Sequence, residues 1–426
     1  MTKFHLLVLI HGMWGNPIHL AELERIVQET YSEPTEDGVR LHVLTAQTIR
    51  EESTYDGVDW GGERVAQEVI DQVAAFEKDG DSVVRFSVTG YSLGGLIARY
   101  CIGVLHQRGF FEKIEAINFN TIATPHCGLP SYHTLISSIT RGLGPKLLSR
   151  TGEQFYCVDK WSPKGRPLLV VMADPERVFY QALTKFKNLR IYANSVNDLT
   201  VPYVTAAIET TDPFAEEDIN GIEIKMKEKY PCLIEQHRLP DVPPPKPAKP
   251  TALTPQWFKT LKPSKPLPPF LQFRFPLNII FYSSLPILIP TILTMVLIRF
   301  TLASRSSRAR VKQLEKESKE SQTERLAYVL AELEHEMEEA VVDFIDNPDP
   351  SPSYLSSEKS RAHPIISPTH HKIANWLNQL PIQKELAYFP ATRNSHAMII
   401  CRDVKRFDIH KLGEPLVRHW ATSLVI

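Results

Sequence analysis

The 426-residue chain has little of several features that mark other protein classes. Its formal net charge is −1, so it lacks the excess of Lys and Arg that binds phosphate backbones, and we expect no nucleic-acid partner. Its five cysteines are odd in number and show neither C-x-x-C spacing nor a His cluster at zinc spacing. This pattern predicts no disulfide framework and no metal site. We expect reduced core residues of a cytosolic protein at Cys101, Cys127, Cys157, Cys232 and Cys401.

The N-terminus has no pattern of a cleaved signal peptide. An apolar run that is typical of a buried strand, Phe4–Ile10, starts within four residues of the first Met. A fold that needs this strand cannot lose it by processing. We therefore expect the body of the protein to remain in the cytosol.

Residues 90–94 read Gly-Tyr-Ser-Leu-Gly, between an apolar β-rich run at 83–88 and an apolar helical run at 96–101. The G-x-S-x-G pattern between a strand and a helix is typical of a nucleophile elbow, in which the glycines permit a sharp turn. Ser92 would stand at its tip as the nucleophile. The Leu93 N–H would then point at the oxyanion that forms when Ser92 attacks a carbonyl.

The segment after the first strand, His11-Gly12-Met13-Trp14-Gly15, is the second motif. A His-Gly loop at this place can supply the other oxyanion donor, and we expect it from the Met13 N–H. An ordinary tight turn is the alternative. We expect His11 and Trp14 to contact substrate, and His126, within the later Thr-Pro-His-Cys-Gly segment, to form part of the pocket wall.

An acid and a histidine should follow the nucleophile in that order. Apolar runs predict three strands after the elbow, at 116–120, 168–172 and 189–193. Asp198 lies in the polar loop after the last of these strands and is the expected acid, although a turn-forming role would also suit it. Asp174, after the preceding run, is the second candidate.

The expected base is His396, one of fifteen histidines. It lies in the loop after the final predicted strand, 385–389, where this fold places its base. His419 falls within a C-terminal helical pattern, so we expect it to be packed or solvent-facing. His126 precedes the acid in sequence, and His237 becomes the first alternative if the apolar segment that begins at Phe275 crosses a membrane.

Taken together, these motifs resemble the lipase-like putative serine esterases of the α/β-hydrolase superfamily, a group that includes a fungal lipid-droplet phospholipase. The resemblance implies an α/β-hydrolase fold with a mostly parallel central sheet, and an acyl hydrolase of lipid esters with Ser92, Asp198 and His396 as its triad. Such a triad needs no cofactor. The chain departs from the group at Cys127, where a larger aliphatic residue is common, and in its insertion, so the lipid class stays open. The resemblance covers most of 4–210 and 370–424, with matching stretches at 9–17, 55–57, 62–65, 90–95, 123–128, 192–198 and 395–397.

The insertion between acid and base begins with a Pro-rich linker at 239–274 and continues with an apolar segment at 275–303. No charged residue occurs from Phe275 to Ile298; as a straight helix this run would be about 36 Å long, enough for a hydrocarbon core of about 30 Å. A buried helix of a soluble core is the alternative. We expect a membrane anchor on a lipid droplet or the endoplasmic reticulum, with the catalytic domain facing the cytosol.

The order of the triad predicts how this anchor enters the membrane. A single crossing would separate His396 from Ser92, and both flanks of the anchor are basic, as cytoplasmic flanks are. We therefore expect a hairpin or re-entrant segment that bends at Pro286 and Pro290. A charged amphipathic helix at 311–345 and a flexible loop should complete the insertion region 304–369.

The expected hydrolase core thus has two parts, residues 1–238 and residues 370–426. The favoured function is hydrolysis of lipid carboxylic esters through an acyl-enzyme on Ser92. A lipid acyltransferase with the same triad and a membrane-tethered scaffold with a vestigial site are the alternatives; an intact set of catalytic motifs disfavours the scaffold.

Overall fold

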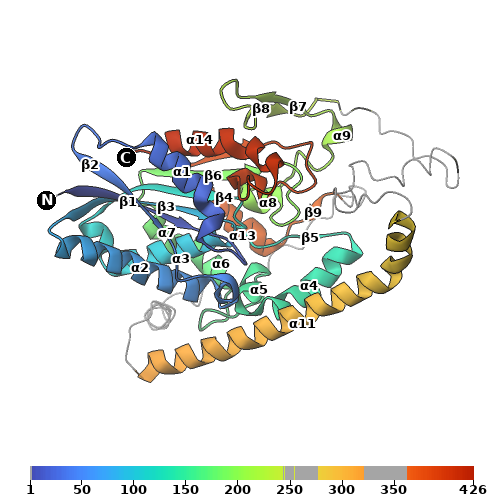
Figure 1. Ribbon diagram of the computed structural model, residues 1–426, viewed down its shortest axis with the longest axis horizontal. Helices are drawn as coiled ribbons and strands as arrows, with labels where there is room; N and C mark the ends of the chain where they lie inside the picture. The colour runs from blue at the N-terminus through green and yellow to red at the C-terminus, as the bar shows by residue number, and fades with distance from the viewer. Residues whose placement is uncertain (1, 243, 245–253, 255–276, 321–361) are drawn as a thin grey trace, which may run out of the picture.

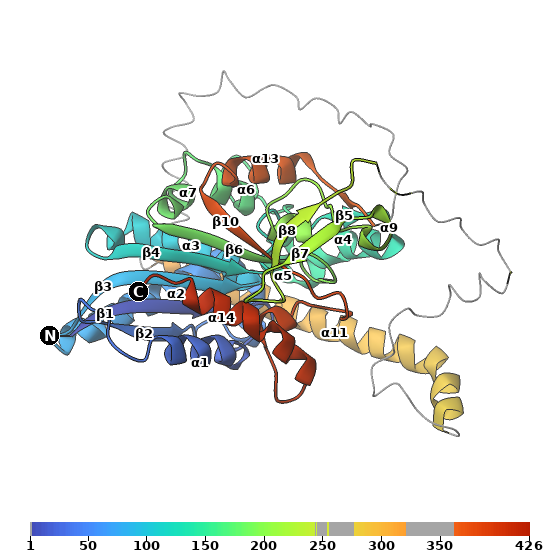
Figure 2. The same ribbon diagram turned by 90° about the horizontal axis from the view of Figure 1, so that it is seen from above.

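The computed structural model describes residues 2–242, 244, 254, 277–320 and 362–426. Six strands form one sheet in the order β10-β6-β4-β3-β1-β2, and every neighbouring pair is parallel (Figures 1 and 2). This sheet confirms the predicted α/β-hydrolase fold. Its strands are β1 (Lys3–Ile10), β2 (Val39–Thr45), β3 (Ser82–Tyr91), β4 (Glu115–Ile122), β6 (Asn188–Asn194) and β10 (Ile382–Ala387).

Helices cover both faces of the sheet because its inner strands are apolar on both sides. Successive side chains of β1 alternate: Leu6 and Val8 pack on one face, and Leu7 and Leu9 on the other. The first face carries α2 (Val58–Lys78), α3 (Leu93–Gln107), α6 (Leu168–Ala173), α7 (Val178–Leu183) and α13 (Pro368–Leu377). The second face carries α1 (Ala21–Thr30) and α14 (Glu414–Thr422).

Shorter elements gather beyond the carboxyl ends of the strands, where loops of parallel sheets build sites (Figure 1). Two small antiparallel pairs lie there, β5 (Ser131–Tyr132) with β9 (Pro364–Ile365) and β7 (Glu223–Met226) with β8 (Ile234–Arg238). The short helices are η1 (Pro17–Leu20), η2 (Glu51–Tyr55), η3 (Phe110–Glu112), α4 (Leu135–Leu147), α5 (Ser149–Phe155), α8 (Tyr203–Ala206), α9 (Glu217–Asn220), η5 (Met398–Ile400) and η6 (Asp408–Gly413).

One predicted strand is wrong. The apolar run at 168–172 forms helix α6, whose six side chains are all buried. A short continuous apolar run fits a buried helix as well as a buried strand, so its composition could not separate the two. The other predicted strands are present, with β10 beginning and ending a few residues earlier than expected.

The apolar segment belongs to a single 44-residue helix, α11 (Leu277–Glu320). Pro286 and Pro290 lie inside it, and the chain does not reverse at them, so the expected hairpin is wrong. A proline removes one hydrogen bond and bends a helix, while the bonds on either side keep the helix continuous. Figure 1 shows this bend near the N-terminal end of α11. The predicted helix at 311–345 is present to Glu320, and its remainder lies outside the described residues, as does most of the predicted linker.

All five cysteines are free thiols. Four are buried, at 101, 127, 232 and 401, and Cys157 is half-buried. The prediction that they are unpaired residues of the interior is therefore confirmed for the four buried ones.

Candidate active site

Ser92 lies at the turn between β3 and α3 with backbone angles φ 55° and ψ −125°. A positive φ is costly for a residue with a side chain, and such strain is typical of a nucleophile elbow. The flanking glycines make the turn possible: a Cβ on Gly90 would lie 2.4 Å from the Gly94 carbonyl oxygen, and one on Gly94 would lie 2.1 Å from the Ile10 carbonyl oxygen. The sequence pattern Gly-x-Ser-x-Gly is thus a steric requirement of this turn.

The three side chains predicted as the triad are brought together. Ser92 Oγ lies 3.1 Å from His396 Nε2, and His396 Nδ1 lies 2.9 Å from Asp198 Oδ2. A carboxylate only accepts hydrogen bonds, so we assign the ring proton to Nδ1, which leaves Nε2 to accept from the serine hydroxyl. The three residues come from the turn after β3, the loop after β6 and the loop after β10, which all end at one edge of the sheet.

The Asp198 carboxylate is fixed by three further donors. Its Oδ1 accepts the N–H groups of Thr200 and Val201 at 2.9 and 2.8 Å, and its Oδ2 accepts the Asn194 amide at 2.8 Å. Burial by itself would raise the pKa of Asp198, but the facing His396 ring and these hydrogen bonds outweigh it, so the pKa lies below the ordinary value. Asp198 therefore stays ionised and can hold the His396 ring in one tautomer.

Hydrogen bonds to its backbone also fix the position of His396. The Tyr91 hydroxyl donates to the His396 carbonyl at 2.8 Å, and the two rings lie 5.1 Å apart. The His396 N–H donates to Asn394 Oδ1 at 3.2 Å, and Ser395 N–H to the Asn197 carbonyl at 2.9 Å. Sequence reasoning did not single out Tyr91, although its position directly before the nucleophile was the available signal.

The two expected oxyanion donors lie in the segments that flank Ser92. Leu93 begins α3, so its N–H is one of the unpaired donors at a helix N-terminus. On the other side the loop after β1 touches the nucleophile, because a Cβ on Gly12 would lie 2.7 Å from Ser92 Cβ and 3.2 Å from Ser92 Oγ. Met13 follows Gly12 directly, so both expected donors belong to backbone next to the reacting oxygen.

The three residues expected to contact substrate differ in exposure. His11 is fully buried and its ring N–H donates to the Gly12 carbonyl at 3.0 Å; burial lowers the pKa of His11 to about 4. His126 is also buried, with Nε2 2.8 Å from Thr121 Oγ1, and burial holds the pKa of His126 well below its ordinary value. Both rings are therefore neutral interior groups, whereas Trp14 is 47% exposed. Substrate contact by these residues stays a prediction.

The other candidates lie elsewhere. Asp174, at the end of α6, pairs with Arg166 at 2.9 Å. His419 is buried on α14, with Nδ1 3.0 Å from the Tyr192 hydroxyl, and His237 lies on β8. Among the residues that the structure describes, no group of three or more His, Cys, Asp or Glu side chains is arranged to hold a metal ion.

Comparison with known proteins agrees with this site. Residues 1–211 match the family described as "Putative serine esterase (DUF676)". Similarity to this family thus extends over almost half of the chain. The match contains Ser92, Asp198 and the loop after β1, and His396 lies beyond it.

Two curated relatives are named as lipases. The chain is 32% identical over 221 residues to "Putative lipase C4A8.10" of Schizosaccharomyces pombe, which is 51% of this chain and 28% of that protein. It is 28% identical over 208 residues to "Putative lipase ROG1" of Saccharomyces cerevisiae, 48% of this chain and 29% of that protein. The chain therefore spans less than a third of the length of these relatives.

Solved structures with some similarity are bacterial hydrolases. A putative cell surface hydrolase from Lactobacillus plantarum has 14% identity and a TM-score of 0.30, covering 48% of this chain and 75% of that one. Phospholipase PlaB from Legionella pneumophila has 17% identity and a TM-score of 0.21, and the match covers 30% of this chain and 26% of that one.

Proposed function

We propose that this protein is a serine hydrolase that cleaves carboxylic esters of lipids through an acyl-enzyme. The observation that carries the proposal is the hydrogen-bonded chain from Ser92 through His396 to Asp198, placed on a strained elbow. A nucleophile, a base within reach of its proton and a third group that orients the base are the parts that such catalysis requires.

In this mechanism His396 Nε2 takes the Ser92 proton as Ser92 Oγ forms a bond to the ester carbonyl carbon. The Leu93 and Met13 N–H groups hold the oxyanion of the tetrahedral intermediate. The intermediate collapses as the protonated His396 gives its proton to the leaving alcohol, and the acyl group remains on Ser92. Water then repeats the two steps and releases the fatty acid. Ionised Asp198 stabilises the His396 imidazolium during both acylation and deacylation.

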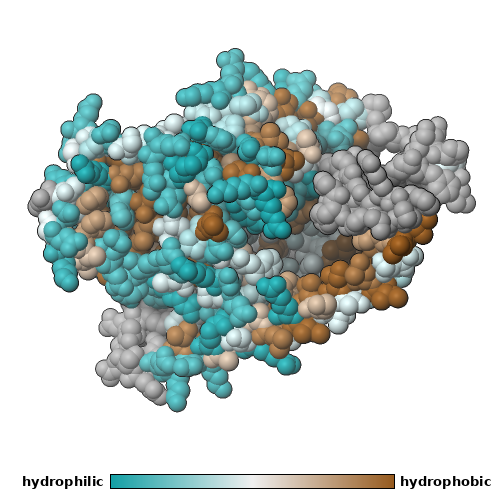
Figure 3. Space-filling model, viewed as in Figure 1, coloured by the Kyte–Doolittle hydropathy of each residue, from teal (hydrophilic) through white to brown (hydrophobic). Residues whose placement is uncertain are grey.

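A lipid substrate is supported by a large apolar surface beside the body. Helix α11 contains a stretch, within Ile279–Glu317, that is long and apolar enough to cross a membrane by length and composition, and its most apolar part is not buried in the protein. Helix α4 contacts α11 at its C-terminal end, where Ser304 Oγ donates to the Lys146 carbonyl. It has no buried residue, and its Leu135 is 84% exposed. Figure 3 shows hydrophobic residues gathered over both helices. Apolar surfaces of this extent mark interaction sites, and the curated relatives carry the name lipase.

The contacts of the chain on either side of the apolar stretch favour attachment to one leaflet. Before it, Leu233 pairs with Ala387 of β10; after it, Ala303 and Val311 are buried against the body. Residues 239–276 between them contain several Lys and Pro residues. If α11 crossed a bilayer, this linker would have to return through hydrocarbon, where unpaired backbone and charge are costly. We therefore propose an in-plane helix on the cytosolic leaflet of the endoplasmic reticulum or on a lipid-droplet monolayer.

A labelling experiment followed by a lipid panel tests the function. The full chain in detergent is treated with a fluorophosphonate probe and then assayed on a triglyceride, a phosphatidylcholine and a short-chain ester, with Ser92→Ala as the matched control. We expect labelling and release of fatty acid by the native chain alone. Hydrolysis of none of the three, or equal labelling of the control, would overturn the proposal. Transfer of the acyl group to an added alcohol in preference to water would instead assign an acyltransferase.

A further inference from the structure

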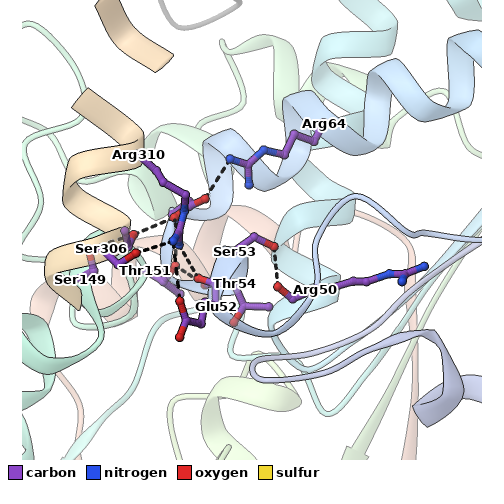
Figure 4. A network of polar contacts seen from close by, with 12 residues as sticks. Arg50, Glu52, Ser53, Thr54, Arg64, Ser149, Thr151, Ser306 and Arg310 are labelled. Carbon is purple, nitrogen blue, oxygen red and sulfur yellow. Dashed lines mark hydrogen bonds and ion pairs between the residues drawn. The ribbon is translucent and has the colours of Figure 1, made fainter. Parts of the chain in front are cut away.

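Asp56, directly after η2, is fully buried and accepts hydrogen bonds from two helices, α2 and α11. Arg64 of α2 donates to its Oδ2 at 2.9 Å. Two residues of α11 donate to its Oδ1, Ser307 at 2.8 Å and Arg310 at 2.9 Å. Figure 4 shows Arg64 and Arg310 approaching η2 from the two helices. A buried carboxylate that loses such partners is strongly destabilised, so Asp56 ties α11 firmly to the body.

The contact face of α11 suits close approach. Its buried residues are small or slender and recur three or four positions apart, as one face of a helix requires. Arg310 extends the contact by donating also to the Glu52 carbonyl at 2.9 Å, within η2 itself. Among residues 279–317 of α11, the buried ones are Ala303, Ser304, Ser307 and Val311.

Helix η2 in turn holds the loop after β1. The Trp14 N–H donates to Thr54 Oγ1 at 3.2 Å, and the Trp14 ring N–H donates to the Tyr55 hydroxyl at 2.8 Å. The Glu51 N–H donates to the Gly15 carbonyl at 3.0 Å. Trp14 has a φ of 54°, an unfavourable value that these neighbours must maintain.

Helix α11 also touches this loop directly. The Phe300 ring stacks on the Trp14 ring with centroids 5.7 Å apart and planes within 6° of parallel. Stacked aromatic pairs of this kind add stabilisation beyond that of their buried area. The loop 11–15 is thus held by α11 both through η2 and through Phe300.

We propose that Ser307, Arg310 and Phe300 of α11 are positioning residues for the Met13 N–H, acting through Asp56, η2 and Trp14. The inference rests on the proposed function, since it assigns these residues to the same site. Gly12 touches Ser92, so a shift of the loop moves the expected oxyanion donor relative to the reacting carbonyl. Displacement of a donor by about 1 Å can cost about 10²-fold in rate, so we expect kcat to fall when this contact is lost.

The test compares Arg310→Gln combined with Ser307→Ala against a matched control, Arg308→Gln. Arg308 is an exposed neighbour on the same helix and pairs with Glu153 at the surface. The substrate is a soluble short-chain ester, so membrane binding does not enter. We expect kcat to fall about tenfold in the double variant with KM changed less than about twofold, and the control to match the native chain. Arg310→Lys should recover part of the rate because it keeps a cation beside Asp56.

Two further readouts separate positioning from simple loss of structure. A trifluoromethyl ketone, which forms an oxyanion on Ser92, should bind more weakly by about the same factor as kcat, while a neutral amide inhibitor binds equally. Backbone hydrogen exchange of residues 11–15 should be faster in the double variant than in the control. If the double variant unfolds, Phe300→Ala is tested in the same way, since that ring lies at the surface of the contact.

The outcomes distinguish the two proposals. A native chain with no esterase activity but faster exchange of residues 11–15 in the variants would refute the proposed function and keep only the structural support of this loop by α11. An active native chain whose variants keep native kcat, inhibitor affinity and exchange would refute the positioning role alone. Equal losses of affinity for the ketone and the amide would assign Ser307, Arg310 and Phe300 a merely structural role.

Discussion

The two halves of helix α11 are built from different residues and meet different surroundings. Its first half, 279–299, exposes large aliphatic side chains, with Ile287 76% and Met295 65% exposed. Its second half buries Ala303 and Ser307 and sends Arg310 to a buried carboxylate. One continuous helix therefore presents an apolar arm and, further along, a polar, small-residue face toward the protein. Figure 2 shows the first half of α11 extending away from the body.

This difference assigns the halves separate tasks. Small residues permit close approach and hydrogen bonding, so the second half belongs to the hydrolase body. Large aliphatic side chains along this half are exposed, so we expect the first half to partition into lipid. Catalysis and attachment should then be lost independently of each other when one half or the other is changed.

Ser92→Ala should have the largest effect. We expect ester hydrolysis to fall by about 10³-fold or more, because the variant retains only oxyanion stabilisation and binding. Flotation with phospholipid vesicles should be unchanged, since Ser92 lies in the body and not on the arm. Loss of vesicle binding in this variant would contradict the separation of tasks.

His396→Ala should lose hydrolysis by a factor close to that of Ser92→Ala, because the members of a triad act as a unit. His419→Ala is the matched control: that histidine is similarly buried but lies on α14, where it contacts the Tyr192 hydroxyl and not the triad. We expect the control to change kcat by less than about threefold. A larger loss for His419→Ala would show that the base is misassigned.

Polar substitution of the apolar arm should affect attachment and leave catalysis intact. Replacing Ile287, Ile292 and Met295 together by Asn removes several buried methylene groups per site from any lipid contact, at about 0.8 kcal/mol each. We expect vesicle binding to fall at least about tenfold, while kcat on a soluble ester stays within about twofold. A loss of both vesicle binding and kcat would mean that the apolar first half of α11 also stabilises the hydrolase body.

The smallest expected effect concerns the body beneath the second half of α11. Burial raises the pKa of Asp159 to about 6, so the folded protein prefers its protonated form, and stability falls as pH rises through 6. Asp159→Asn mimics that form and can still accept the Leu168 N–H. We expect Asp159→Asn to raise the Tm at pH 7.5 and to raise it by less at pH 4.5, where the folded-state carboxyl is still mostly protonated. A gain of equal size at both values would contradict the role of ionisation.

The parts of the site that could be predicted from the sequence are those whose conformation depends on residues nearby in the chain. The elbow needs Gly90 and Gly94 for steric reasons that any such turn shares, and chain order then led to Asp198 and His396. Other features depend on tertiary contacts. The pairing of Ser307 with Asp56 joins residues 251 positions apart and leaves no periodic pattern.

Two predictions, the strand at 168–172 and the hairpin at Pro286 and Pro290, were wrong for the same reason: each used a local pattern where tertiary packing decides. The run at 168–172 is apolar enough for a strand and became a helix because its neighbours in the core are helices. Pro286 and Pro290 suggested a reversal, yet a proline determines only a local bend. The path of the chain beyond the bend depends on where the next residues pack, here on η2 and α5.

The position of β10 has a consequence for synthesis of the enzyme. It is one of the two edge strands of the six and pairs in that sheet with β6 alone. The hydrogen bond from Arg190 to Gln383 joins residues 193 positions apart. On a ribosome, the nucleophile and acid emerge long before this strand does, and the open edge of β6 must wait for it. His396 follows β10, so the catalytic chain is completed by one of the last folding events. We therefore expect a nascent chain that lacks His396 to have no hydrolytic activity.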